Sequence, residues 1–141
     1  MTLSYAEDPT SESADRVRGS TDTEVNNRID RQTDANIARF SGLGRDAVLL
    51  RIAALNHEWD VERVLEVNAS TLALSGLALG VTVNKKWLVV PGVVLSFLLQ
   101  HGLQGWCPPL PILRRLGVRT RGEIDREKCA LKAVLDRHLA P

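Results

Sequence analysis

Aromatic residues and cysteines are scarce in this chain of 141 residues. Phe, Trp and Tyr make up 4% of it, and its two cysteines are Cys107 and Cys129. Aromatic side chains supply much of the contact area in a soluble core, so their scarcity argues against a soluble domain that is stable by itself. The hydrophobic content of 44% is nevertheless sufficient for one small domain.

Patterns typical of enzymes and nucleic-acid-binding proteins are also missing. The sequence has no paired carboxylates, nucleophile and base set, phosphate-binding loop or metal-ligand cluster. His57 beside Glu58 offers two ligands at most, so we expect no metal and no other cofactor. The net charge of +1 favours neither nucleic acid nor an acidic partner. We therefore expect a non-enzymatic protein.

The first 59 residues divide into a polar tail and two helices. Residues 1–20 are rich in Ser, Thr, Asp and Glu and lack the basic start and apolar run of a signal peptide, which indicates a disordered cytoplasmic tail. Residues 21–59 carry apolar residues at helical spacing. They predict two cytoplasmic amphipathic helices, with apolar positions at Val25, Ile29, Ile37 and Phe40, and then at Val48, Ile52, Leu55 and Trp59.

Residues 60–106 contain two apolar segments, 67–83 and 87–106, joined by Asn84-Lys85-Lys86. As helices they would be roughly 25 and 28 Å long, close to the thickness of a bilayer core of about 30 Å. This predicts a hairpin of two short transmembrane helices in an all-α protein. However, Ser96, Gln100, His101 and Gln104 interrupt the second segment, so a soluble helical hairpin remains an alternative.

The residues around the hairpin predict its orientation. Trp59, Trp87 and Trp106 stand where indole rings would anchor at membrane interfaces. Basic residues are more frequent on the two outer flanks than in the link, where Lys85 and Lys86 lie. They are Arg45, Arg51 and Arg63 before the hairpin and Arg114, Arg115, Arg119 and Arg121 after it. Both termini are therefore expected on the cytoplasmic side.

Small residues suggest how the two helices of the hairpin pack. Four of them share one face of the first helix: Ala69, Ala73, Gly76 and Gly80. Folding the chain at Lys85-Lys86 places Gly80 opposite Gly92 and Gly76 opposite Ser96. Small residues let helices approach closely in lipid, so we expect these positions to form the helix interface.

Part of the chain resembles a known family. The residues that carry the resemblance are DVERVLEVNAS, the two apolar segments, and LLQHGLQGWCPPLPILRRLGVRTRGEIDREKCALKAV, over about 60–134. This stretch is similar to the YgaP-type transmembrane hairpin domain of bacterial inner membranes, a domain of unknown function. The resemblance implies a two-helix membrane domain, which in other proteins is sometimes joined to a rhodanese-type sulfurtransferase domain. No such domain fits in this chain.

Residues 107–141 are expected to form a proline-rich exit and a C-terminal amphipathic helix. The prolines after Cys107 would stop the second apolar helix, and Thr120 with Glu123 fits a capping box that begins a helix from about Arg121 to His138. Cys107 is a candidate reactive thiol, although no second cysteine follows it at redox spacing. Cys129 is expected to be a packing residue, and both thiols are expected to stay reduced.

Three hypotheses of function follow. The first is a small bacterial inner-membrane scaffold, anchor or accessory subunit, in contact with the lipid bilayer and bound to a second copy or to another membrane protein. The second is a sulfur or redox accessory protein that uses Cys107. The third is a soluble helical bundle that serves as an interaction module. His101 is a further candidate, because an ionisable residue at membrane depth is often functional.

Overall fold

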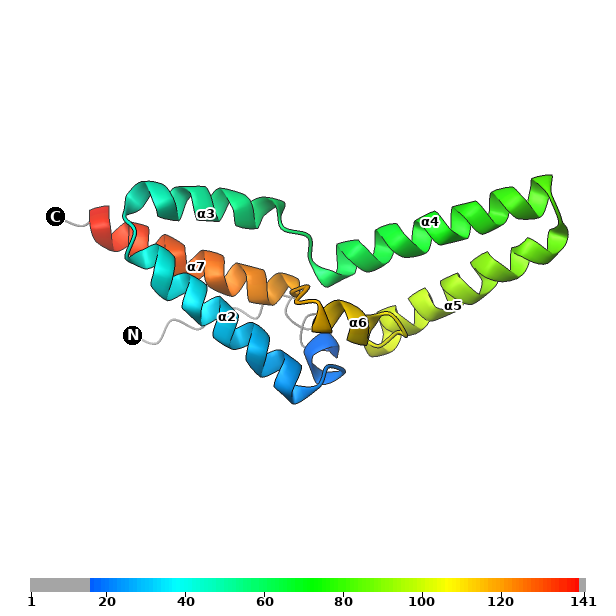
Figure 1. The fold of residues 1–141 in the computed structure, drawn as a ribbon, viewed down its shortest axis with the longest axis horizontal. Helices are drawn as coiled ribbons and strands as arrows, with labels where there is room; N and C mark the ends of the chain where they lie inside the picture. Colours follow the sequence, from blue (N-terminus) through cyan, green and yellow to red (C-terminus); the bar gives the residue numbers. More distant parts are fainter. Residues whose placement is uncertain (1–15, 140–141) are drawn as a thin grey trace.

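The chain folds into helices that form two parts, a head and a projecting hairpin (Figure 1). A computed structural model describes residues 16–139. After a helical turn at 16–19, its elements are α2 (Thr23–Ser41), α3 (Arg45–His57), α4 (Val61–Thr82), a 3-10 turn (Lys85–Leu88), α5 (Val89–Gln104), α6 (Leu110–Arg115) and α7 (Arg121–Leu139). The head contains α2, α3, α6 and α7, whereas α4 and α5 form the hairpin. The predicted all-α class is confirmed.

Local hydrogen bonds set the helix boundaries. Asp22 caps α2 by accepting from the backbone N–H of Glu24 at 2.8 Å, and Asp60 caps α4 in the same way. The predicted capping box is present, since the N–H of Thr120 donates to Glu123 and the N–H of Glu123 donates to the Thr120 hydroxyl.

The second hairpin helix ends at a glycine, so the prediction that prolines stop it is wrong. Gly105 has a φ of 71° and follows the last residue of α5. A Cβ here would also lie 2.8 Å from the backbone carbon of Arg16, so both the conformation and the close approach require glycine. The prolines instead begin α6, where Pro109 is the N-cap.

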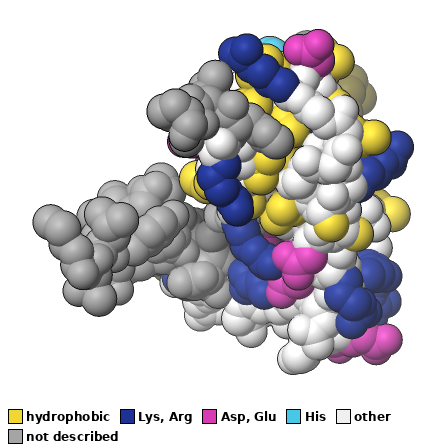
Figure 2. Space-filling model, turned by 90° about the vertical axis from the view of Figure 1, so that its left-hand side faces the viewer, with side chains coloured by type: hydrophobic (Ala, Val, Ile, Leu, Met, Phe, Trp, Pro, Cys, Tyr) yellow, Lys and Arg dark blue, Asp and Glu magenta, His cyan; other side chains and the backbone are white. Residues whose placement is uncertain are grey.

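Two apolar clusters hold the described residues together. The first lies between helices of the head and contains Val48, Leu55, Ile124 and Leu131. The second joins head to hairpin and contains Val17, Val61, Leu65, Cys107 and Leu110. Seen from the head end, Lys, Arg, Asp and Glu side chains lie around hydrophobic ones (Figure 2).

The prediction of a disordered tail over residues 1–20 is wrong for residues 16–20. Residues 1–15 lie outside the described residues, but residues 16–20, which the tail was expected to include, form a helical turn and its continuation. Val17 is buried in the cluster that joins head to hairpin, and Arg18 forms ion pairs with Asp30 and Glu123. These contacts explain why this part of the polar stretch is folded.

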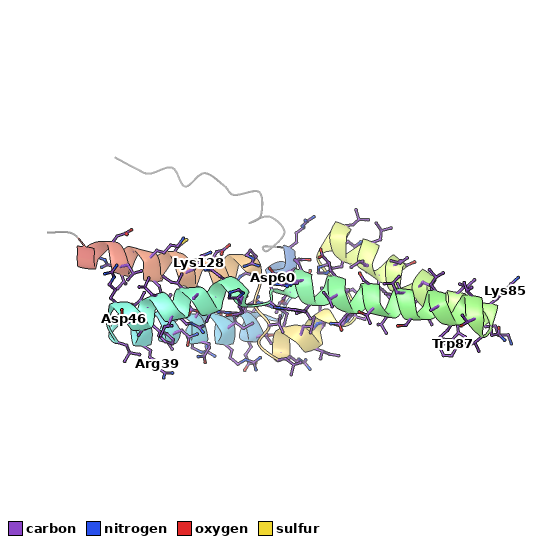
Figure 3. All side chains as sticks on the ribbon, turned by 90° about the horizontal axis from the view of Figure 1, so that it is seen from above. Arg39, Asp46, Asp60, Lys85, Trp87 and Lys128 are labelled. Carbon is purple, nitrogen blue, oxygen red and sulfur yellow. The ribbon has the colours of Figure 1, made fainter. Side chains whose placement is uncertain are left out.

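The hairpin exposes most of its apolar surface. Two helical segments, Arg45–Thr82 and Lys85–Gln104, are long and apolar enough to span a membrane, and 17% and 6% of the residues in their most apolar windows are buried. The exposed large side chains lie along both helices: Leu72, Leu74, Leu77, Leu79, Val81, Val83, Trp87, Leu88, Val89, Val93, Leu95, Phe97, Leu99 and Leu103. Lys85 and Trp87 mark the tip farthest from the head (Figure 3).

Candidate functional site at the junction of head and hairpin

Cys107 lies in the wall of a cavity between the hairpin and α6. The cavity has a volume of about 370 Å³, within the range of small-ligand sites. The Cys107 side chain is buried, with 3% of its surface exposed. The cavity lining is mostly apolar: Leu65, Ala69, Leu72, Val94, Phe97, Leu98, Pro108, Pro109 and Leu113, with Asn68, His101 and Cys107 as the remaining members.

His101 occupies the head end of the same cavity. Its Nε2 lies 2.9 Å from Oε2 of Glu62, which comes from the first turn of α4. Its Nδ1 is buried without a hydrogen-bond partner among the residues that the structure describes. Only 6% of the side chain is exposed, so His101 is buried and not solvated.

The other polar residues of the hairpin are satisfied within their own helices. The amide of Asn68 donates to the carbonyl of Val64 at 2.8 Å, and the side chains of Gln100 and Gln104 bond to each other at 3.4 Å. His101 is therefore distinct from them, because its partner Glu62 belongs to the facing helix.

Cys129 does not belong to this site. It is exposed on α7, so the prediction that it packs inside the protein is wrong. Both cysteines are free, and the expected absence of a disulfide between them agrees with the structure. Cys129 thus provides an exposed thiol against which the buried Cys107 can be compared.

A network of buried ion pairs lies beside the junction. Arg114 is fully buried and donates to both carboxylate oxygens of Glu123 at 2.7 Å, and Arg18 also bonds to Glu123. Burial alone would raise the pKa of Glu123. Hydrogen bonds from Arg114 and the backbone of Thr120 outweigh it and hold the pKa below its usual value.

A second part of the network surrounds Glu127, which is also fully buried. Arg51 bonds to one of its oxygens at 2.7 Å and Arg119 to the other at 2.5 Å, while Arg119 also binds Glu58. Burial favours a higher pKa for Glu127, but the hydrogen bonds of Arg51 and Arg119 lower it overall. These arginines therefore tie α3, α7 and the α3–α4 connection together.

Sequence reasoning missed this network. It counted the arginines near the hairpin only as basic flanks that set its orientation, whereas Arg51, Arg114, Arg119 and Arg121 form ion pairs with carboxylates of the protein. A signal was present, because Glu127 stands between Ile124 and Leu131 at core spacing on the same helix. A carboxylate at a core position indicates a buried partner.

The small residues of the hairpin are placed only partly as expected. Gly76 and Gly80 are buried against the second helix, and Ala69 and Ala73 are half-buried. A Cβ on Gly80 would meet Leu88, and one on Gly76 would meet Val90 and Pro91. The predicted pairing with Gly92 and Ser96 is wrong. The 3-10 turn in the link brings Leu88, Val90 and Pro91 onto α4, whereas Gly92 and Ser96 are exposed.

The three tryptophans all have exposed rings. Trp87 lies at the tip of the hairpin, and Trp106 follows the end of α5. Trp59 precedes α4, and the guanidinium of Arg63 covers its ring at 4.4 Å from the centroid. Their role as interface anchors stays a prediction.

The described residues contain no cluster of three metal-ligating side chains. No family model, curated protein or solved structure matches the chain. The resemblance to the YgaP-type hairpin domain therefore depends on the sequence motifs alone.

Proposed function

We propose that this protein is a small bacterial inner-membrane protein whose hairpin enters the bilayer while its head stays on the cytoplasmic face. The observation that carries the proposal is the contrast in burial described above: two long apolar helices leave the head and expose nearly all their large side chains. A contiguous apolar surface of this kind is unfavourable in water and favourable in lipid.

The dimensions of the hairpin support this placement. With 22 residues α4 is roughly 33 Å long, and the segment from Lys85 to Gln104, with 20 residues, is of similar length. Both are close to the hydrocarbon thickness of about 30 Å. The lysines at the tip would reach the periplasmic interface, and the arginine-rich head would remain in the cytoplasm.

We propose the role of a scaffold, an anchor or an accessory subunit, with a second copy or another membrane protein as its partner. Gly92 and Ser96 support this role, because they are exposed on the outer surface of α5 rather than used within the hairpin. Small residues four positions apart allow a further helix to approach closely in lipid.

Cell fractionation tests the proposal. The protein should sediment with inner membranes, resist a carbonate wash and require detergent for release. Recovery in the soluble fraction, or release by carbonate, would favour the soluble helical bundle instead.

Fusions test the orientation. Alkaline phosphatase fused after Lys86 should be active, since it would reach the periplasm, and the same enzyme fused after Pro141 should be inactive. The reverse pattern would contradict the proposed topology.

A further inference from the structure

The cavity at the junction has one polar end and a long apolar wall. On α4 its lining runs from Leu65 to Leu72, a distance of roughly 10 Å along the helix. On α5 it runs from His101 back to Val94. Cys107 and His101 both belong to the lining. The shape therefore suits a linear hydrocarbon chain whose reactive end lies at the thiol.

Three side chains of the site have the chemistry of a nucleophile, a base and an orienting carboxylate. They are Cys107, His101 and Glu62. The carboxylate of Glu62 can only accept, so the hydrogen bond of 2.9 Å places a proton on Nε2 of His101. Nδ1 is the ring nitrogen left to exchange a proton with a substrate, and it has no regular hydrogen bond among the described residues. Cys107 lines the same cavity as this imidazole, so a thioester bound there would place the thiol and His101 in one site.

We propose that this site accepts an acyl chain as a thioester on Cys107, with an acyl thioester of a small thiol as the donor. The apolar cavity would hold the chain, His101 would act as base, and Glu62 would act as a positioning residue. The proposal goes beyond a membrane scaffold. It does not require the hairpin to span the bilayer, because the site consists of side chains already in place.

The reaction is an exchange of thioesters and needs no oxidant or reductant. Nδ1 of His101 takes the proton of the Cys107 thiol, and the sulfur attacks the carbonyl carbon of the donor. The new bond joins that carbon to Sγ of Cys107, and the bond to the donor sulfur breaks. The departing thiolate takes the proton back from His101, so the imidazole is regenerated.

Cys129 supplies the natural comparison. It is a free cysteine of the same chain, but it is exposed on α7 and is not part of the cavity lining. Non-selective acylation of thiols would favour it over the buried Cys107. Selective acylation of Cys107 therefore reports the site rather than general thiol reactivity.

The experiment incubates the full-length protein, purified in detergent, with octanoyl coenzyme A and follows its intact mass. We expect one octanoyl group per chain, removable by hydroxylamine. Cys107→Ser should abolish it and Cys129→Ser should not. His101→Gln, which keeps a donor for Glu62 and removes the base at Nδ1, should slow the reaction about 100-fold. No acylation of the wild type, or acylation mainly at Cys129, would overturn the proposal.

A variant that fills the cavity keeps the test decisive if His101→Gln does not fold. Ala69→Phe, in the cavity wall, should slow transfer from octanoyl coenzyme A at least tenfold more than transfer from acetyl coenzyme A. Ala78→Phe is the matched control on the exposed side of α4 and should change neither rate. Equal effects of the two variants, or equal loss with both donors, would contradict the role of the cavity.

The role of Glu62 has its own readout. Glu62→Ala should slow acylation because His101 loses its orientation, and Glu62→Gln should restore much of the rate, since the amide oxygen still accepts from Nε2. An unchanged rate in Glu62→Ala would remove Glu62 from the site.

Discussion

The head and the hairpin of this protein place charge and apolar surface in opposite ways. The head buries arginine and glutamate side chains, with Arg114 and Glu127 fully inaccessible, while the hairpin exposes leucine and valine along its length. In water, each arrangement costs free energy unless something compensates it. In the head, ion pairs and hydrogen bonds compensate. In the hairpin, lipid is the proposed compensation, so the two parts should respond to different perturbations.

Acid should give the largest difference between the parts. Asp30, Glu123 and Glu127 have pKa values lowered below 3.8, 4.5 and 4.5, and their ion pairs therefore stabilise the head above those ordinary values. The stability of the head should be constant from pH 7 to about pH 5 and fall as pH decreases below about 4.5. Circular dichroism during urea unfolding in detergent would measure it.

The hairpin provides the internal control for acid. Residues 67–106 contain no Asp or Glu, so their helical signal should persist when the head unfolds. Loss of the whole helical signal in a single step at low pH would show that the head and the hairpin unfold together in acid.

Glu123→Gln should give the next largest effect. It keeps the shape and the acceptor for the N–H of Thr120, but it leaves Arg114 as a buried charge without its carboxylate. Breaking a buried pair in this way costs about 3 kcal/mol, which urea unfolding of the head would detect. A change below about 1 kcal/mol would mean that Arg114 is satisfied by Asn26 and the carbonyl of Val118 alone.

Gly76→Leu should have a smaller effect, confined to the hairpin. Its Cβ would lie 2.6 Å from Cδ of Pro91 and 2.8 Å from Cβ of Val90, neither of which is the end of a flexible chain. Overpacking of this kind costs about 1 to 3 kcal/mol. The measurement is disulfide trapping between Gly80→Cys and Leu88→Cys, in a protein in which Cys107 and Cys129 are replaced by serine. Adding Gly76→Leu to this protein should make the trapping less efficient.

The matched control is Gly92→Leu, because nothing lies within 4 Å of a Cβ at Gly92. It should leave trapping within the hairpin unchanged and weaken only the proposed association between copies. Equal loss of trapping in both variants would contradict the described packing of α4 on α5.

Asp34→Ala should have the smallest effect. Asp34 pairs with Arg126 at the surface, and their side chains are 59% and 48% exposed. Exposed pairs contribute at most about 1 kcal/mol, so the urea midpoint should move little compared with Glu123→Gln. A loss as large as that of Glu123→Gln would mean that ion pairs stabilise the head regardless of burial.

The sequence predicts the helices better than the contacts between them. Apolar spacing, the Thr120–Glu123 capping box and the Asn84-Lys85-Lys86 link place the helices of the head and the hairpin, because each signal is local. The register of the hairpin could not be predicted, since it depends on a 3-10 turn that brings Leu88 onto Gly80. A local pattern does not define such a turn.

The candidate site shows the same limit. Cys107 and His101 stand out in the sequence as isolated chemical groups, and neither indicates that Glu62, far away in the chain, reaches His101. That contact follows from the antiparallel hairpin and from the cap of α4 at Asp60. The cavity likewise requires α6 to fold back against the hairpin, which the proline-rich sequence alone does not specify.

The most direct test of the central claim labels thiols in intact bacterial cells with a maleimide that cannot cross the inner membrane. Lys85→Cys at the hairpin tip should react from the periplasm, whereas the exposed native Cys129 of the head should react only after the inner membrane is permeabilised. Labelling of Cys129 in intact cells, or protection of Lys85→Cys until lysis, would contradict a hairpin that crosses the membrane with its head in the cytoplasm.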